Sequence, residues 1–187
     1  MPQSFTDTQP SDADLVARVL ASNDMQAFGL LVARHERGVR AMLGSLCRGQ
    51  PAVEDLAQET FIRALDRLSQ ARDPERLGAW LNSIAYREFL MWRRSRSRYT
   101  EVLAAVADTA PVTHTPDHET SQLDRYLAVL ADNEREAIVL CHGAGLSHGE
   151  VAAAMALPLG TVKSLIQRGK IRIQKHFGAT EQVQSHA

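Results

Sequence analysis

The stretch from Gly160 to Phe177 contains five basic residues and no acidic residue, a composition that suits contact with nucleic acid. Glutamine and arginine side chains can pair with adenine and guanine edges, whereas lysine and serine bind either bases or phosphates. The side chains of these types that fall off the apolar stripe, all within the first two helical turns, are Lys163, Ser164, Gln167 and Arg168. A recognition helix reads base edges with those turns, so we expect these side chains to contact DNA.

The residues before this stretch follow the plan of a helix-turn-helix. Ser147 and Glu150 form a capping box at the start of a short helix. Pro158 cannot continue that helix, and Thr161 can cap the longer basic helix that follows. The apolar side of the basic helix, which must pack on the first helix, is formed by Val162, Leu165, Ile166, Gly169 and Ile173. The alternative is an amphipathic helix with an ordinary solvated basic face. The capping box, the proline turn and the lack of acids favour DNA recognition.

A second basic cluster ends a helix that we expect to begin near Leu77. Five arginines and one acid lie between Arg87 and Arg98, and they would neutralise phosphates without reading sequence. The buried stripe predicted for this helix is Leu81, Ile84, Ala85, Phe89 and Trp92. Tyr86 falls off that stripe, so we expect it to stack on an unpaired base.

The stretch from Val53 to Leu65, VEDLAQETFIRAL, is typical of an amphipathic helix with acids early and an arginine late. Its predicted apolar face is Val53, Leu56, Ala57, Phe61 and Leu65. Its polar face mixes Asp55, Gln58 and Glu59, which suits a specific protein partner. Composition alone leaves a plain solvated face as the alternative.

The whole pattern predicts an all-α protein of two small helical domains joined by an acidic linker. Of the 187 residues, 44% are hydrophobic and only 5% aromatic, so the core must consist mainly of aliphatic side chains in helices. The segment from Tyr99 to Glu119 has acids but no lysine or arginine. The expected divisions are a leader at 1–10, domains at 11–98 and 120–177, the linker at 99–119 and a tail at 178–187.

Four strings in this order resemble the bacterial RNA polymerase sigma factors of the extracytoplasmic-function (ECF, sigma-70 group IV) family. They are DLVARVLASNDMQAFGLLVARH, EDLAQETFIRAL, AWLNSIAYREFLMWRRSRSR and LSHGEVAAAMALPLGTVKSLIQRGKIRI, which together cover most of residues 11–177. EDLAQETF and GTVKS are the specific strings, and the others support them.

The resemblance implies a partner for each of the three polar surfaces. Asp55, Gln58 and Glu59 would bind the clamp of the largest subunit of core RNA polymerase. The loop 68–77 and the helix 80–94 would read and open the −10 promoter element, with these residues in contact: Tyr86, Arg87, Arg93 and Arg94. The −35 element would be contacted by Thr161, Lys163, Ser164, Gln167 and Arg168.

The resemblance also implies that the linker runs toward the polymerase active site and RNA exit path. The flap of the second-largest subunit is a further implied contact, and an anti-sigma factor is an implied regulator.

The sequence departs from the family pattern at three places. Arg87 stands where the family usually has an asparagine that helps to hold an extruded −10 base. Leu165 stands where the family commonly has an arginine, and Gly169 where it has an alanine. We therefore expect an altered −10 preference and one contact fewer at the −35 element.

Other chemistries are not indicated. Cys47 and Cys141 are far apart, each in an apolar helical pattern, so we expect no disulfide and a reducing cytoplasm. The pattern gives no reason for His114 and His118, or Cys141 and His142, to come together as ligands of one metal ion. We expect no cofactor and no small-molecule substrate. We also expect no signal peptide and no membrane insertion. No catalytic arrangement indicates an enzyme.

Two alternatives to a sigma factor remain open. A stand-alone helix-turn-helix regulator would leave EDLAQETF unexplained. A sigma mimic that titrates an anti-sigma factor normally carries a receiver domain, which we do not expect here.

Overall fold

The structure, a computed structural model, describes residues 9–48, 50–106 and 122–184 and contains helices but no strand within those ranges. The N-terminal domain consists of α1 (Asp12–Ser22), α2 (Met25–Cys47), α3 (Val53–Asp66), two short 3₁₀ turns (Leu68–Gln70 and Pro74–Arg76) and α4 (Leu77–Val106). The C-terminal domain consists of α5 (Gln122–Ala128), α6 (Asp132–Ile138), a π-helical turn (Val139–Gly143), α7 (His148–Met155) and α8 (Leu159–Gln184). This confirms the predicted all-α architecture of two helical domains.

Capping hydrogen bonds determine where the first two helices begin and end. The Ser11 hydroxyl accepts a hydrogen bond from the Asp14 amide, and the Asp14 carboxylate accepts one from the Ser11 amide. Asn23 ends α1 in a left-handed conformation, with φ of 53°. The Asp24 carboxylate then accepts hydrogen bonds from Gln26 and Ala27, both at 3.0 Å, and begins α2.

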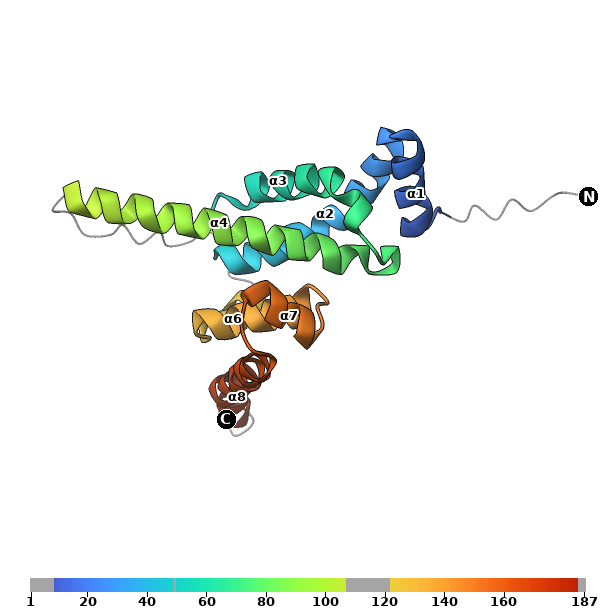
Figure 1. The fold of residues 1–187 in the computed structure, drawn as a ribbon. Helices are drawn as coiled ribbons and strands as arrows, with labels where there is room; N and C mark the ends of the chain where they lie inside the picture. Colours follow the sequence, from blue (N-terminus) through green and yellow to red (C-terminus); the bar gives the residue numbers. More distant parts are fainter. Residues whose placement is uncertain (1–8, 49, 107–121, 185–187) are drawn as a thin grey trace, which may run out of the picture.

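The core of the N-terminal domain lies between α2, α3 and α4, which run side by side, while α1 packs at one end (Figure 1). Most residues of the two predicted stripes of this domain are buried there, including Leu56, Ala57, Leu81, Ile84, Ala85 and Phe89. They pack with buried residues of α2, among them Leu31, Val39 and Leu43. Phe61, Leu65 and Trp92 are half-buried against this core. Thr60, which the pattern does not mark, is buried because its hydroxyl donates to the Leu56 carbonyl at 2.6 Å.

The C-terminal domain is built on the approach of α8 to α6. Gly169 lies where the two helices meet, and a Cβ there would come within 2.5 Å of Ile138 Cδ1. The buried residues of this domain include Leu127, Leu130, Ala137, Leu140, Val151, Val162, Leu165 and Ile166. Glycine at position 169 therefore permits a backbone approach that a larger residue would oppose.

Two helices extend beyond the predicted domain limits. Helix α4 continues to Val106, so the first residues of the predicted linker are helical, and α8 continues to Gln184 into the predicted tail. The rest of the linker from 107 onward, with its prolines and with His114 and His118, lies outside the described residues, as does most of the leader. The domain divisions therefore stay predictions.

The two domains pack against each other, which the sequence does not predict. Helix α7 contacts α4, and the π-helical turn contacts α2. In Figure 1 the layer of α6 and α7 lies between α4 and α8. The face of α4 that turns toward the C-terminal domain is consequently covered.

Candidate nucleic-acid and polymerase-binding surfaces

Helices α7 and α8 form the helix-turn-helix that the sequence predicts. The Glu150 carboxylate accepts hydrogen bonds from the amide and hydroxyl of Ser147, both at 2.7 Å, which fixes the start of α7. Ala156 ends α7 with φ of 53°. Helix α8 begins at Leu159, so Thr161 lies inside its first turn, and our expectation of a Thr161 cap is wrong. The two helices meet at 106°, within the usual range for this motif.

The polar side of α8 is exposed to solvent. All five residues predicted for the −35 element have exposed side chains: Thr161, Lys163, Ser164, Gln167 and Arg168. Leu165 is only 6% exposed, because its side chain packs into the core of the domain. The separation of buried and exposed positions follows the helical period that the sequence shows.

A buried carboxylate holds two arginines at the edge of this face. Glu134 on α6 is buried, and its two oxygens lie 3.8 Å from Arg168 Nε and 3.4 Å from Arg172 Nε. The same side chain accepts a hydrogen bond from the Ala131 amide at 3.2 Å. Glu134 thus orients both guanidinium groups while they remain largely exposed.

Helix α3 presents a second exposed surface. Asp55 and Gln58 are exposed, and Glu59 is partly exposed, with an ion pair to Arg63 at 2.9 Å. Ile62 lies one turn further on the same face and is 58% exposed. Ile62 is not among the residues predicted for this face, although its spacing from Asp55 and Gln58 places it there. Ile62 adds an apolar side chain to this otherwise polar face, although a single exposed apolar residue is ordinary on a protein surface.

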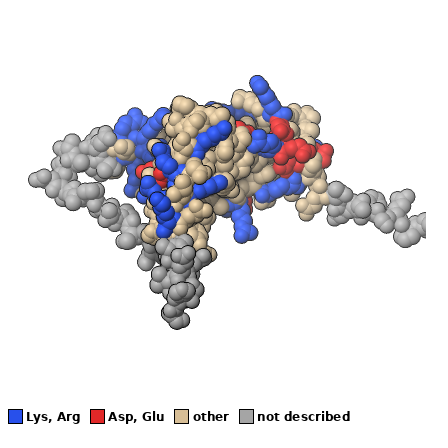
Figure 2. All heavy atoms as spheres, turned by 90° about the horizontal axis from the view of Figure 1, so that it is seen from below, with Lys and Arg blue, Asp and Glu red and all other residues tan. Residues whose placement is uncertain are grey.

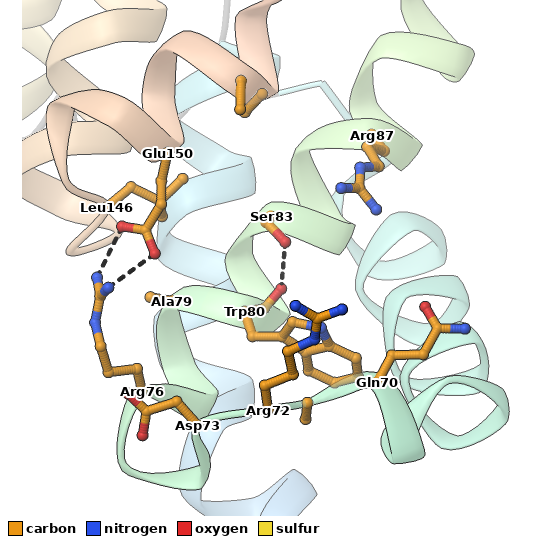
Figure 3. A pocket seen from close by; sticks show the side chains of 13 residues that line it. Gln70, Arg72, Asp73, Arg76, Ala79, Trp80, Ser83, Arg87, Leu146 and Glu150 are labelled. Atoms are coloured by element: carbon orange, nitrogen blue, oxygen red, sulfur yellow. Dashed lines mark hydrogen bonds and ion pairs between the residues drawn. The ribbon is translucent and has the colours of Figure 1, made fainter.

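A pocket of about 350 Å³ lies between the loop 70–76 and helix α4 (Figure 3). Gln70, Arg72 and Trp80 line it from the N-terminal domain, together with Arg87. Its other wall comes from the C-terminal domain and consists of Leu146, Glu150, Ala153 and Ala154. A half-buried indole beside guanidinium groups is suited to stacking on a base and to binding its phosphate.

The comparison with known proteins matches both domains. The chain matches the family model of sigma-70 region 2 over residues 31–99 and that of sigma-70 region 4 over residues 120–173. It is 34% identical to the ECF RNA polymerase sigma factor SigE of Mycolicibacterium smegmatis, over 96% of this chain and 77% of that protein. The chain belongs to the ECF sigma factors of RNA polymerase. As a member, it is an alternative sigma factor that binds core polymerase and directs it to promoters.

Other sigma factors are also similar to this chain over most of its length. The ECF RNA polymerase sigma-E factor of Haemophilus influenzae is 32% identical over 89% of this chain and 95% of its own length. The sigma factor RpoE of Bartonella quintana, solved with the anti-sigma factor NepR, covers 79% of this chain and 94% of its own, with 28% identity and a TM-score of 0.63. CnrH, solved with the cytosolic domain of CnrY, covers 91% of this chain and 99% of its own, with 30% identity and a TM-score of 0.60.

The residues predicted for the −10 element of this sigma factor do not share one environment. Arg87 and Arg94 are exposed, and Arg87 lines the pocket. Arg93 is exposed but forms an ion pair with Glu136 of the C-terminal domain. Tyr86 is only 1% exposed, and its hydroxyl donates to Glu136. Our prediction that Tyr86 lies off the buried stripe is therefore wrong for the packed protein, because α6 covers it.

These contacts shift the pKa values of two side chains, Tyr86 and Glu150. Burial raises the pKa of the Tyr86 phenol, and the bond to Glu136 adds to the rise. The pKa of Glu150 falls to about 2, chiefly because Arg76 donates two hydrogen bonds of 2.8 Å to it. In the view from the α8 side, lysine and arginine atoms are spread over much of the surface, whereas acidic atoms gather mostly toward the α1 end (Figure 2).

The described residues contain no metal-ligand cluster and no single helix suited to span a membrane. Within residues 9–48, 50–106 and 122–184, no group of three or more histidine, cysteine or acidic residues could hold a metal ion. Over the same ranges, no single helix is long and apolar enough to cross a membrane. Only α7 and α8 taken together pass that test, as a bent pair.

Proposed function

We propose that the three surfaces of this sigma factor divide the work of initiation among them. The face of α3 formed by Asp55, Gln58 and Glu59 binds the clamp of the largest polymerase subunit. The pocket beside α4 and the adjacent arginines bind the −10 element. The polar face of α8 reads the −35 element, while the C-terminal domain contacts the flap of the second-largest subunit.

The observation that carries this proposal is the exposed polar face of α8 above a fully packed apolar face. Lys163, Gln167 and Arg168 are exposed in the first turns of the second helix of a helix-turn-helix, where base contacts form. A basic helix that only faces solvent would not need α7 to cross α8 at 106°, the arrangement that presents the first turns of α8 to a DNA groove.

For the −10 element, the pocket indicates how an unpaired base would be held. Flipping a base costs a few kcal/mol of stacking, which contacts with an aromatic ring and a cation can offset. Trp80 and Arg72 line the pocket, and Arg87 stands where the family usually has asparagine. A guanidinium at position 87 favours a base edge with acceptors, such as guanine, over the edges an amide would select.

Regulation by an anti-sigma factor is part of the proposal. RpoE of Bartonella quintana and CnrH were solved with the anti-sigma factor NepR and with the cytosolic domain of CnrY, respectively. Their similarity to this chain extends over most of its length, which supports an anti-sigma factor as a regulator of this chain too.

Promoter-specific transcription with purified core polymerase tests the proposal. Core polymerase plus this chain should initiate at discrete sites on fragments of the source genome, and core polymerase alone should not. A chain that binds duplex operators tightly by itself, while core initiates nowhere, would be a stand-alone regulator. A chain that binds neither core nor DNA but captures an anti-sigma factor would be a mimic.

A further inference from the structure

A buried carboxylate of α6 faces two arginines of α8. Glu134 is only 3% exposed, whereas Arg168 and Arg172 are largely exposed. Burial of a charged group is unfavourable unless opposite charges and hydrogen bonds compensate for the lost water. Because the two arginines supply that compensation from another helix, the orientation of their side chains is coupled to the position of Glu134.

The spacing along α8 places Glu134 between the two guanidinium groups. Arg168 and Arg172 are four positions apart, so they lie one turn from each other on the same side of the helix. Gly169 follows Arg168, and a Cβ at this position would lie 3.5 Å from the Cβ of Glu134. Glu134 therefore lies close against α8, with Oε1 3.8 Å from Arg168 Nε and Oε2 3.4 Å from Arg172 Nε.

The other acids of α6 and α7 have partners elsewhere. Asp132, Glu136 and Glu150 pair with arginines of the N-terminal domain, and α8 has no acid between Leu159 and Phe177. Among the described acids of these three helices, Glu134 is thus the one that pairs with the basic face. A negative charge there opposes the binding of phosphates whatever the DNA sequence. Glu134 therefore does not serve the general affinity of this face for DNA.

Helix capping explains only part of this arrangement. Glu134 Oε2 accepts a hydrogen bond from the Ala131 amide at 3.2 Å, which caps the start of α6. A cap of this kind needs one oxygen, and the neutral amide of a glutamine supplies it as well as a carboxylate does. The charge of Glu134 is not needed by the cap, but it is used by the two arginines.

We propose that Glu134 is a positioning residue that gives the basic face of α8 its selectivity at the −35 element. The proposal rests on the proposed assignment of that face to this element. Held by Glu134, Arg168 presents its guanidinium in one direction, toward a guanine edge. Released, it reaches the phosphates that every duplex offers. A side chain that is ordered before binding loses less entropy when it meets its base, so Glu134 lowers general affinity and raises discrimination.

Glu134→Gln tests this proposal, because glutamine keeps the shape and the cap and removes the charge. Holoenzyme containing the full chain is mixed with promoter fragments whose −35 element is randomised, and the bound fragments are sequenced. The preference at the base pair that Arg168 reads should fall about three- to tenfold. The chain alone is titrated with a fluorescein-labelled, mixed-sequence duplex, and its affinity should rise about threefold because one repulsive charge is absent.

Two further variants separate positioning from charge. Glu134→Asp keeps the charge but withdraws the carboxylate by one methylene group, so the preference should fall while the affinity for the mixed-sequence duplex stays close to that of the wild type. Glu36→Gln removes an acid of α2 that pairs with Arg40 on the same helix at 3.4 Å, and it should leave the −35 preference unchanged. Circular dichroism verifies that each variant is folded.

The double variant with Arg168→Ala shows whether Glu134 acts through Arg168. Both single variants should lose preference at the same base pair, and the double variant should lose no more than Arg168→Ala alone. Loss at different base pairs, or additive losses, would overturn the proposal. So would an equal fall in both affinities with unchanged preference, since a merely structural role has that effect. A wild-type holoenzyme without any −35 preference is a different result, which contradicts the proposed function itself and this inference with it.

Discussion

Arg168 combines exposure with restraint. Its guanidinium is largely exposed, but Nε lies 3.8 Å from the buried Glu134 carboxylate, which keeps the side chain near one orientation. A restrained arginine loses less conformational entropy when it pairs with guanine, so the same contact contributes more to binding. Arg172, one turn further along α8, shares Glu134 at 3.4 Å and lies beyond the first two turns.

We expect Arg168→Ala to weaken binding to the cognate promoter by roughly 1–3 kcal/mol and to relax preference at one base pair. Arg172→Ala removes the same charge beside the same carboxylate, so it controls for loss of a phosphate contact. Binding of polymerase holoenzyme to promoter fragments with single base substitutions measures both. An equal loss across all sequences would make Arg168 a phosphate contact.

Residues whose environment depends on their own helix could be predicted from the sequence. Lys163 and Gln167 are exposed and Leu165 is buried as the helical period requires. Tyr86 could not be predicted in this way. Its cover comes from Glu136, fifty positions along the chain, and no local pattern reports such a partner. The role of Trp80 could not be predicted for a similar reason, since the walls of its pocket come from both domains.

At the scale of elements, α3 carries the proposed polymerase contact on a face separate from its buried one. Glu54 and Asp55 are neighbours, both exposed, but they point about 100° apart on the helix. Glu54 pairs with Arg40 of α2 at 3.0 Å, so it faces its own domain, whereas Asp55 shares the outer face with Gln58 and Ile62.

Asp55→Ala should weaken the affinity for core polymerase by about 1–2 kcal/mol and leave the thermal unfolding midpoint almost unchanged. Glu54→Ala, with the same change of charge one residue away, should leave core affinity close to that of the wild type. A competition assay against a labelled sigma factor measures both variants. Unchanged affinity for Asp55→Ala, or equal losses for both, would contradict the assigned face.

The approach of α8 to α6 depends on Gly169 and Ile138. Alanine in place of a helical glycine gains about 1 kcal/mol of helix propensity. Here a Cβ would lie 2.5 Å from Ile138 Cδ1, so this methyl group, the far end of the Ile138 side chain, must move. Its displacement offsets part of the gain in helix propensity.

Gly169→Ala alone should raise the free energy of unfolding by clearly less than about 1 kcal/mol. In an Ile138→Val background the colliding methyl group is absent, and the same change should raise it by the full amount of about 1 kcal/mol. Denaturant unfolding of the two single variants and the double variant forms a thermodynamic cycle. Additive effects would show that Ile138 does not oppose the side chain at 169. The sequence departs from the family at this position, but only the structure reveals the neighbour that decides the outcome.

At the scale of the whole molecule, the packing of the two domains shields the Tyr86 phenol from solvent. Tyr86 is buried between the domains, and burial together with the Glu136 bond raises the pKa of its phenol. A tyrosine with a raised pKa stabilises the packed state fully below the ordinary phenol pKa of about 10. That stabilisation is lost as the pH rises above this value. A pH above this value should thus weaken the packing of the domains, whereas mild acid should not act through this residue.

Titration of tyrosinate absorbance tests whether the domains stay packed in solution. Tyr86 is one of three tyrosines, and in the native chain it should remain protonated through the ordinary phenol range. Wild type and Tyr86→Phe should therefore show the same rise in absorbance in that range. In denaturant, the wild type should exceed the variant by the contribution of one tyrosine. A smaller native rise for Tyr86→Phe would mean that the phenol is accessible and the domains are already apart.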